Sequence, residues 1–219
     1  MPPVRAGRTP DGFMEPSTTT RFLVLRKTPY SESSLVLAGI SPDAGQIHFL
    51  VRGARKLGRR HFPEADLFQI LEVRYRRGSG TLCTWQGAEP EASFRGVAAV
   101  PACFAGACRL AAFALANVQE GLPAPRFFAA MAAALGRLAD PGAGAAQAVS
   151  SSFVGAAMVF LDEHGLLPDH PDNERLERQR NWLLQAAEKP GPLPELPETD
   201  WRNLEKWMTA LLLHHECRM

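Results

Sequence analysis

The chain has 219 residues, of which 46% are hydrophobic and 21% are charged, and its formal net charge is +1. This composition is typical of a soluble globular protein, and at this length one large domain or two small ones can bury a core without disulfide staples. The sequence contains neither an apolar N-terminal stretch nor a run of about 18 continuous apolar residues, so we expect no signal peptide and no membrane span.

Composition divides the chain into three parts. Residues 1–20 are rich in Pro, Gly, Ser and Thr with little to bury, which predicts a disordered leader. Residues 21–88 hold short runs of β-branched and aromatic residues between turn residues, typical of β-strands. Residues 89–219 are alanine-rich with helical spacing. The expected fold class is therefore α+β multidomain, with an N-terminal five-stranded β-barrel followed by an all-α helical domain.

Five strands are expected in the β-rich part. They are predicted over Arg21–Thr28, Ser34–Ile40, Gln46–Arg52, Leu67–Arg76 and Thr81–Gln86. In the third, Ile47, Phe49 and Val51 point to one side, so one face of the strand is core. Five short strands are too few for a two-sheet sandwich and fit a small closed barrel, of either the OB or the SH3-like kind.

Five helices are expected in the alanine-rich part. One has a predicted apolar stripe of Phe104, Cys108, Ala111 and Leu115, and another a stripe of Val149, Phe153, Ala156 and Phe160. A third spans Pro125–Ala139 and is broken by the residues that follow it. Glu174–Glu188 and Asp200–His215 complete the set, the last with a stripe of Trp201, Leu204, Met208 and Leu211. Cys103 and Cys108 are expected to be small buried thiols.

The near-zero net charge hides an asymmetry along the chain. Between residues 21 and 77, eleven basic residues face five acidic ones, a surplus of +6, whereas from residue 160 onward seven basic residues face twelve acidic ones, which gives −5. A basic N-terminal part favours nucleic acid as its partner.

The strongest functional signal is the basic loop RGARKLGRRHFPE between the third and fourth strands. It holds five cations within nine residues: Arg52, Arg55, Lys56, Arg59 and Arg60. Arginines on a glycine-containing loop can follow phosphates, and such binding weakens as salt rises. A merely solvated loop is the weaker interpretation, because no acidic residue occurs before Glu64. The predicted DNA-binding set is completed at other strand ends by Arg26, Lys27, Arg74, Arg76 and Arg77.

Two aromatic residues near these cations are candidates for base stacking. They are Tyr30 and Trp85. Aromatic side chains stack bases in single-strand binders. In a small barrel, however, core packing is the favoured interpretation for both.

No constellation of residues indicates an enzyme, a cofactor or a metal site. The terminal HHEC, residues 214–217, lacks the His-Glu-x-x-His spacing, and Ser150–Ser152 have no Gly-x-Ser-x-Gly setting. The four cysteines form no Cys-x-x-Cys pair, and His164 and His170 are isolated. Few cysteines also fit a cytoplasmic location.

The β-rich part resembles the N-terminal OB domain of the RecO recombination mediators. The resemblance is carried by RFLVLRKTPYSESSLVLAGISPDAGQIHFLVRGARK followed by LFQILEVRYRRGSGTL, with a turn holding Tyr30 and Glu32, a glycine turn at Gly45 and Arg-Gly-Ala-Arg at residues 52–55. It covers residues 21–88 and implies an OB-type barrel. Further on, FVGAAMVFLDEHGLLPD is similar to a helix and turn of the same family.

This resemblance implies a non-enzymatic, cytoplasmic and nucleoid-associated bacterial protein. Its expected activity is to bind single- and double-stranded DNA, to anneal complementary strands and, with a RecR-like protein, to help load RecA onto DNA coated by the single-stranded-DNA-binding protein. The stretch PDHPDNERLERQRN contains none of the cysteines of the four-cysteine zinc site that many members carry, so no metal is expected. The chain beyond Asp169 is also short for the family and lacks its basic ending.

A site for a protein partner is expected in the helical part. The acidic C-terminal tail of the single-stranded-DNA-binding protein would need an apolar groove with a cation at its rim. Arg109, Arg126 and Arg137 lie beside apolar helix residues, and the predicted partner-binding residues are Arg109, Arg126 and Phe127. Solvated helix charges are the competing interpretation. The alternative function is a protein-interaction scaffold of RecO-like fold with weak or lost DNA binding, which the shortened, acidic C-terminal part motivates.

Overall fold

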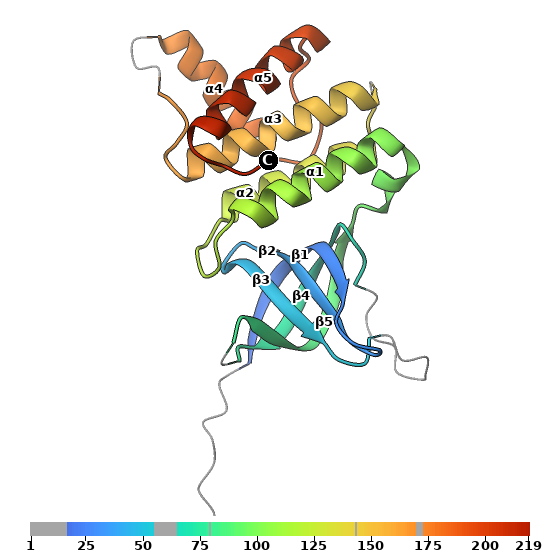
Figure 1. Ribbon diagram of the computed structural model, residues 1–219. Coiled ribbons are helices and arrows are strands. Elements are labelled where there is room, and N and C mark those ends of the chain that lie inside the picture. The colour runs from blue at the N-terminus through green and yellow to red at the C-terminus, as the bar shows by residue number, and fades with distance from the viewer. Residues whose placement is uncertain (1–16, 55–64, 79, 143, 170–172) are drawn as a thin grey trace, which may run out of the picture.

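The computed structural model describes residues 17–54, 65–78, 80–142, 144–169 and 173–219. Its N-terminal half is a closed barrel of five strands (Figure 1). The strands are β1 (Thr18–Pro29), β2 (Leu35–Ser41), β3 (Gly45–Val51), β4 (Gln69–Arg76) and β5 (Leu82–Ser93). Their order is β1-β2-β3-β5-β4, with β4 pairing back to β1, and the β3–β5 pair is parallel. This is the OB-fold, so the predicted five-stranded barrel is confirmed and the SH3-like alternative is removed.

Alternating apolar residues close the barrel around its own core. Phe49 lies at the centre of this core, with its ring edge-on to Phe22, Tyr75 and Trp85 at centroid distances of 4.7, 5.1 and 5.5 Å. Gly39 is required where β2 pairs with β1, because a Cβ there would lie 1.9 Å from the carbonyl oxygen of Leu23. The absence of a side chain at this position lets the two strands approach.

The strands extend beyond their predicted ends. β1 begins at Thr18, within the segment expected to be a leader, because Thr18–Thr20 pair with the end of β4. β5 continues to Ser93, because it pairs along the whole of β4. These extensions depend on pairing between distant segments, which local composition does not record. Residues 1–16 of the predicted leader lie outside the described residues.

Five α-helices follow the barrel, after the short 3₁₀ helix η1 (Arg95–Ala99). They are α1 (Pro101–Asn117), α2 (Pro125–Ala139), α3 (Ala145–Glu163), α4 (Glu174–Ala187) and α5 (Glu198–His214). α3 packs against the other four and is buried on all sides from Ser150 to Leu161. It is the one described helix long and apolar enough to cross a membrane, and 67% of that stretch is buried inside the protein, as in the core helix of a soluble protein.

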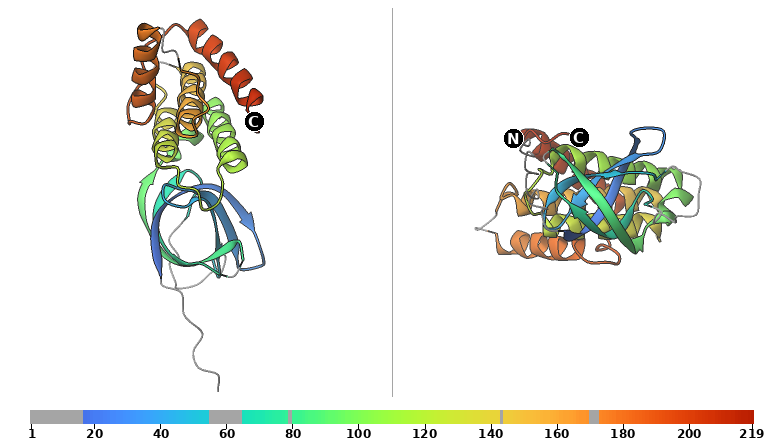
Figure 2. Two further views of the ribbon diagram at one scale, coloured as in Figure 1. Left: turned by 90° about the vertical axis from the view of Figure 1, so that its left-hand side faces the viewer. Right: turned by 90° about the horizontal axis from the view of Figure 1, so that it is seen from below.

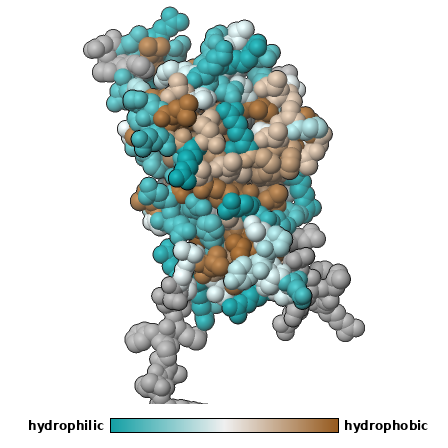
Figure 3. All heavy atoms as spheres, viewed as in Figure 1, coloured by the Kyte–Doolittle hydropathy of each residue, from teal (hydrophilic) through white to brown (hydrophobic). Residues whose placement is uncertain are grey.

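The predicted apolar stripe of α1 is wrong in part. The buried side of this helix carries Cys103, Ala107, Leu110 and Ala114, whereas Phe104 is 41% exposed and Cys108 is exposed. Only one of the two expected buried thiols is therefore buried. In so alanine-rich a helix most faces are apolar, so spacing does not identify the buried one. The outward side of α1 forms a broad pale-brown area across the helical part (Figure 3).

The barrel and the helices share one continuous core. Leu23, Ile40 and Ile70, on the outside of the barrel, pack into the same cluster as the buried residues of α1, α2 and α3. The connection between α1 and α2 is also hydrogen-bonded to the β2–β3 turn, where Gly121 donates to Ala44 O at 2.8 Å and Gln46 to Gln119 O at 3.1 Å. One end of the barrel is thus held against the helices, and the opposite end points away from them (Figure 2).

Candidate nucleic-acid interface

Strand register brings several basic residues together at the end of the barrel away from the helices. Arg76 of β4 lies opposite Thr84 of β5, which lies opposite Leu50 of β3, and Arg74 lies opposite Gly87. Arg52 follows β3 directly and is exposed. Because neighbouring strands lie about 4.8 Å apart, the backbones of β3 and β4 on either side of β5 lie about 10 Å apart. Arg52, Arg74 and Arg76 therefore belong to one surface.

We call this surface the distal face. Its members are exposed, apart from the half-buried Arg76, and they are Arg52, Arg74, Arg76, Arg77, Thr84 and Gln86. Within the described part of the chain, Arg52, Arg74 and Arg77 make no ion pair. The helices cover the other end of the barrel, where Leu23, Ile40 and Ile70 are buried. The distal face is thus positively charged and open to solvent.

The loops beside the distal face match the way an OB-fold binds oligonucleotides. Such barrels use the loops between strands 1 and 2 and between strands 4 and 5, together with the face of strands 2 and 3. The distal face shares these two loops, although most of its strand residues lie on β4 and β5. Tyr30 lies in the β1–β2 loop and is 63% exposed, against the expectation of core packing. Trp85 is buried in the barrel core, as expected. Arg77 begins the β4–β5 loop, so an aromatic side chain and a cation flank the face.

The remaining predicted DNA-binding residues fall into three groups. Arg26 is exposed on β1, opposite Ala38 and outside the distal face. Lys27 is paired with Asp66 at 3.3 Å, so its charge is largely neutralised within the protein. Arg55, Lys56, Arg59 and Arg60 lie outside the described residues, and their assignment stays a prediction.

The three predicted partner-binding residues make contacts inside the helical part, one in its core and two in ion pairs. Phe127 is fully buried, packed against Phe113 and Phe160, so it lines no surface groove. Arg126 is bonded to Asp162 and Glu188, each at 2.7 Å, and its hydrogen bond to Glu188 raises its pKa. Both carboxylates come from distant parts of the chain, which a local pattern does not show.

Arg109 also contacts other residues of the helical part. Its guanidinium pairs with Glu205 and lies over the ring of Phe153 at 3.5 Å from the centroid. Although burial raises the pKa of Glu205, hydrogen bonds from Ser150 and Arg109 hold it below its usual value. This contact fastens α5 to α1 and α3, and it leaves the Arg109 side chain committed to the fold.

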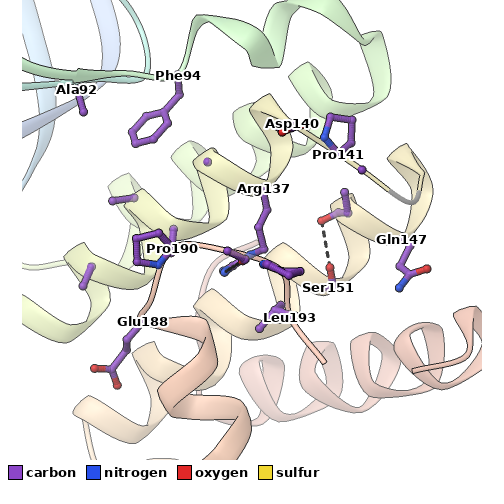
Figure 4. Close-up of a pocket in the computed structure, with 18 of the residues that line it drawn as sticks. Ala92, Phe94, Arg137, Asp140, Pro141, Gln147, Ser151, Glu188, Pro190 and Leu193 are labelled. Carbon is purple, nitrogen blue, oxygen red and sulfur yellow. Dashed lines mark hydrogen bonds between the residues drawn. The ribbon is translucent and has the colours of Figure 1, made fainter. Parts of the chain in front are cut away.

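A separate cavity of about 820 Å³ lies between the barrel and the helices (Figure 4). Ile70 and Phe94 line it from the barrel side, Phe128 from α2, and Leu193 and Trp201 from the α4–α5 connection and α5. These apolar side chains make this part of the cavity suited to an apolar group of a ligand. Three carboxylates also line the cavity, of which Glu91 and Glu188 are paired with arginines and Asp140 is the third.

Arg137 gives this cavity a buried cation. The side chain is 7% exposed, and its Nη atoms donate to the carbonyl oxygens of Ala187, Lys189 and Gly191 at 3.3 Å. No carboxylate pairs with it among the described residues, and desolvation lowers its pKa to about 10, so it remains charged at neutral pH. The Nε of Arg137 and the Nε1 of Trp201 are buried donors that find no acceptor among the residues that the structure describes. Such donors favour an acceptor group on a ligand.

In the sequence alone, Arg137 is not distinguished from Arg109 and Arg126, which also lie beside apolar helix residues. The one local signal is its position between Gly136 and Leu138 in an otherwise apolar helix. What distinguishes it, the lack of a carboxylate partner, depends on the tertiary fold.

Residues 14–94 match a protein-family model described as recombination protein O, N terminal. The matched stretch contains all five strands of the barrel. No curated protein matches the chain.

Proposed function

The N-terminal domain of this chain belongs to the recombination protein O family, and on that premise we propose that the protein is a recombination mediator that binds single- and double-stranded DNA. The family gives the chain a role in DNA repair by recombination. The binding mode, the annealing of complementary strands and the partners named below are our proposal.

The distal face is the observation that carries the proposal. Arg52, Arg74 and Arg77 are exposed cations without ion pairs in the described part of the chain. Each phosphate that they neutralise releases counterions, which favours binding and makes it dependent on salt. Neutralising one strand also lowers the repulsion that a complementary strand meets, so annealing needs no covalent step and no catalytic residue.

The cavity at the barrel–helix junction supports a second part of the proposal. The acidic C-terminal tail of the single-stranded-DNA-binding protein combines an apolar end with a free carboxylate. The apolar end would enter the cavity beside Phe128 and Leu193, and the carboxylate would accept from Arg137 and Trp201. In this way the protein would reach coated DNA and, together with a RecR-like protein, assist RecA loading.

Fluorescence anisotropy with labelled single-stranded and duplex oligonucleotides tests the proposal. We expect wild-type protein to bind both at low salt, and Arg52→Ala/Arg74→Ala/Arg77→Ala to bind both far more weakly. The matched control is Arg202→Ala/Lys206→Ala, which removes two exposed cations from α5 and should leave affinity unchanged. Equal affinity of the triple variant and wild type would exclude the distal face.

The cavity also favours the alternative function, a protein-interaction scaffold of the same fold. A wild-type protein that captures an acidic peptide through Arg137 and binds no DNA even at low salt would establish this alternative. The same pair of measurements therefore separates the mediator from the scaffold.

A further inference from the structure

Helix α4 carries an exposed stripe of cations, amides and one tryptophan. Its members lie along one side of the helix at successive spacings of three, one, three and three residues, and they are Arg175, Arg178, Gln179, Trp182 and Gln185. Trp182 is 56% exposed. We call this surface the α4 stripe. At 1.5 Å per residue, Arg178 lies about 6 Å and Arg175 about 10 Å from Trp182 along the helix axis.

The stripe is turned away from the contacts that hold α4 in place. The inner side of the helix buries Leu184 and Ala187, and Arg180 pairs with Asp162 of α3 at 2.5 Å. None of these contacts uses the indole of Trp182. Trp182 is a large aromatic side chain that is half exposed beside two arginines. Proteins that bind single strands combine these two features, because the aromatic ring stacks a base and the arginines contact phosphates.

The local charge of the stripe is positive although the C-terminal part of the chain is acidic. Asp162, Glu188 and Glu205 are paired with Arg126, Arg180 or Arg109 inside the helical part. Arg175 makes no ion pair in the described part of the chain. Arg178 pairs with Glu174 at 3.1 Å, but both side chains are more than 70% exposed, so solvent screens this pair. The stripe therefore suits a polyanion.

The α4 stripe is also separate from the distal face. α4 lies on the side of the helical part away from the barrel, whereas the distal face lies at the barrel's opposite end (Figure 1). A nucleic-acid strand at one surface leaves the other free.

We infer that the α4 stripe is a second contact for single-stranded DNA, in which a base stacks on Trp182 and Arg175 and Arg178 contact neighbouring phosphates. This inference rests on the proposed function, because it adds a second site to a DNA-binding protein. With one strand at each surface, the protein can hold two strands at once, which annealing requires.

Photocrosslinking tests the contact directly. Wild-type protein is irradiated with a single-stranded oligonucleotide containing 5-iodouracil, and the adducts are mapped by mass spectrometry. We expect an adduct at Trp182, besides adducts in the barrel. Adducts confined to the barrel would overturn the inference and leave the proposed function standing, whereas a wild-type protein that binds no DNA would overturn both.

Affinity measurements give the second readout. Trp182→Ala should lower the affinity for single-stranded DNA about 5- to 150-fold, since it removes one stacked base. Arg175→Ala/Arg178→Ala should reduce the slope of log affinity against log salt by about 1.4, since each single-strand phosphate contact contributes about 0.7. Because these side chains are exposed, the variants should keep the fold.

The matched control is Trp207→Ala on α5. Trp207 is 42% exposed, which makes it similar to Trp182 in exposure. It lies on α5, six residues before the exposed Leu213, and the arginines of the α4 stripe are not on this helix. Its replacement should leave DNA affinity unchanged. An equal loss for both tryptophan variants would refute a specific contact at α4. Capture of an acidic peptide through Trp182, with unchanged DNA affinity, would assign the stripe to a protein partner and overturn the inference.

Discussion

Replacement of Arg137 by methionine separates the charge of this side chain from its bulk. Methionine fills similar space in the cavity wall but carries no charge and no donor. If Arg137 serves to bind an anionic ligand, the variant should lose binding and keep its stability.

The stability change follows from two opposing contributions. Burial without a counter-ion lowers the pKa of Arg137 from its ordinary value to about 10, and a shift of this size corresponds to about 3 kcal/mol of destabilisation of the charged form. Because the folded-state value is the lower one, this cost is present in full below about pH 10. Arg137→Met removes the cost, but it also loses three long hydrogen bonds to carbonyl oxygens, together about 2–3 kcal/mol. We expect the free energy of unfolding to change by about 1 kcal/mol or less.

Binding should change much more than stability. A buried contact between a cation and a carboxylate is worth about 2–5 kcal/mol when one partner is truncated, which corresponds to a loss of about 30-fold or more. The assay is anisotropy with a labelled acidic peptide that ends in an apolar residue and a free carboxylate, and the amidated peptide is the control. Urea denaturation measures the stability of the same variant.

The result that refutes this reasoning is equally specific. If Arg137→Met lowers the free energy of unfolding by more than about 3 kcal/mol and leaves the peptide affinity unchanged, then Arg137 is a structural clamp on the α4–α5 connection and the cavity is no anion site.

Three further predictions concern the fold and the activity. Gly39→Ala should destabilise the barrel by about 3 kcal/mol or more in thermal or urea denaturation, since its Cβ meets the Leu23 carbonyl oxygen, whereas Gly80→Ala, which meets nothing within 4 Å, should be neutral. Glu205→Gln should lower stability near neutral pH. Since the folded-state pKa of Glu205 is lowered, the difference in the free energy of unfolding between variant and wild type should be constant above pH 4.5, the ordinary pKa of the group. This difference should shrink as the pH falls through the folded-state pKa. A difference that does not change with pH down to acid conditions would refute the lowered pKa. Removing the three arginines of the distal face should slow the annealing of complementary oligonucleotides at low salt, and an unchanged rate would separate annealing from that face.

Much of the fold follows from local sequence. α2 has the predicted bounds, because Pro125 suits the first turn of a helix and the residues after Ala139 end it. The stripe of α5 is confirmed at Trp201 and Met208, which are fully buried, although Trp207 and Leu213 on other sides of the helix are exposed apolar residues. In α1 the pattern failed because alanine occurs on every side.

The candidate sites depend more on tertiary structure. The sequence indicates the cations of the distal face, because they stand at strand ends in a basic segment, and their binding of DNA stays a prediction. The structure does not support Phe127 and Arg126 as partner-binding residues. Phe127 is buried in the core, and Arg126 pairs with carboxylates from α3 and from the end of α4. Arg137 stands out only when its lack of a carboxylate partner among the described residues is seen.

The salt dependence of single-stranded DNA binding tests the central claim most directly. The slope of log affinity against log salt is measured for wild type and for Arg52→Ala/Arg74→Ala/Arg77→Ala. Three phosphate contacts predict that the variant slope is shallower by about 2. Parallel slopes for the two proteins, or no binding by wild type at low salt, would contradict the claim that the distal face of this barrel binds DNA.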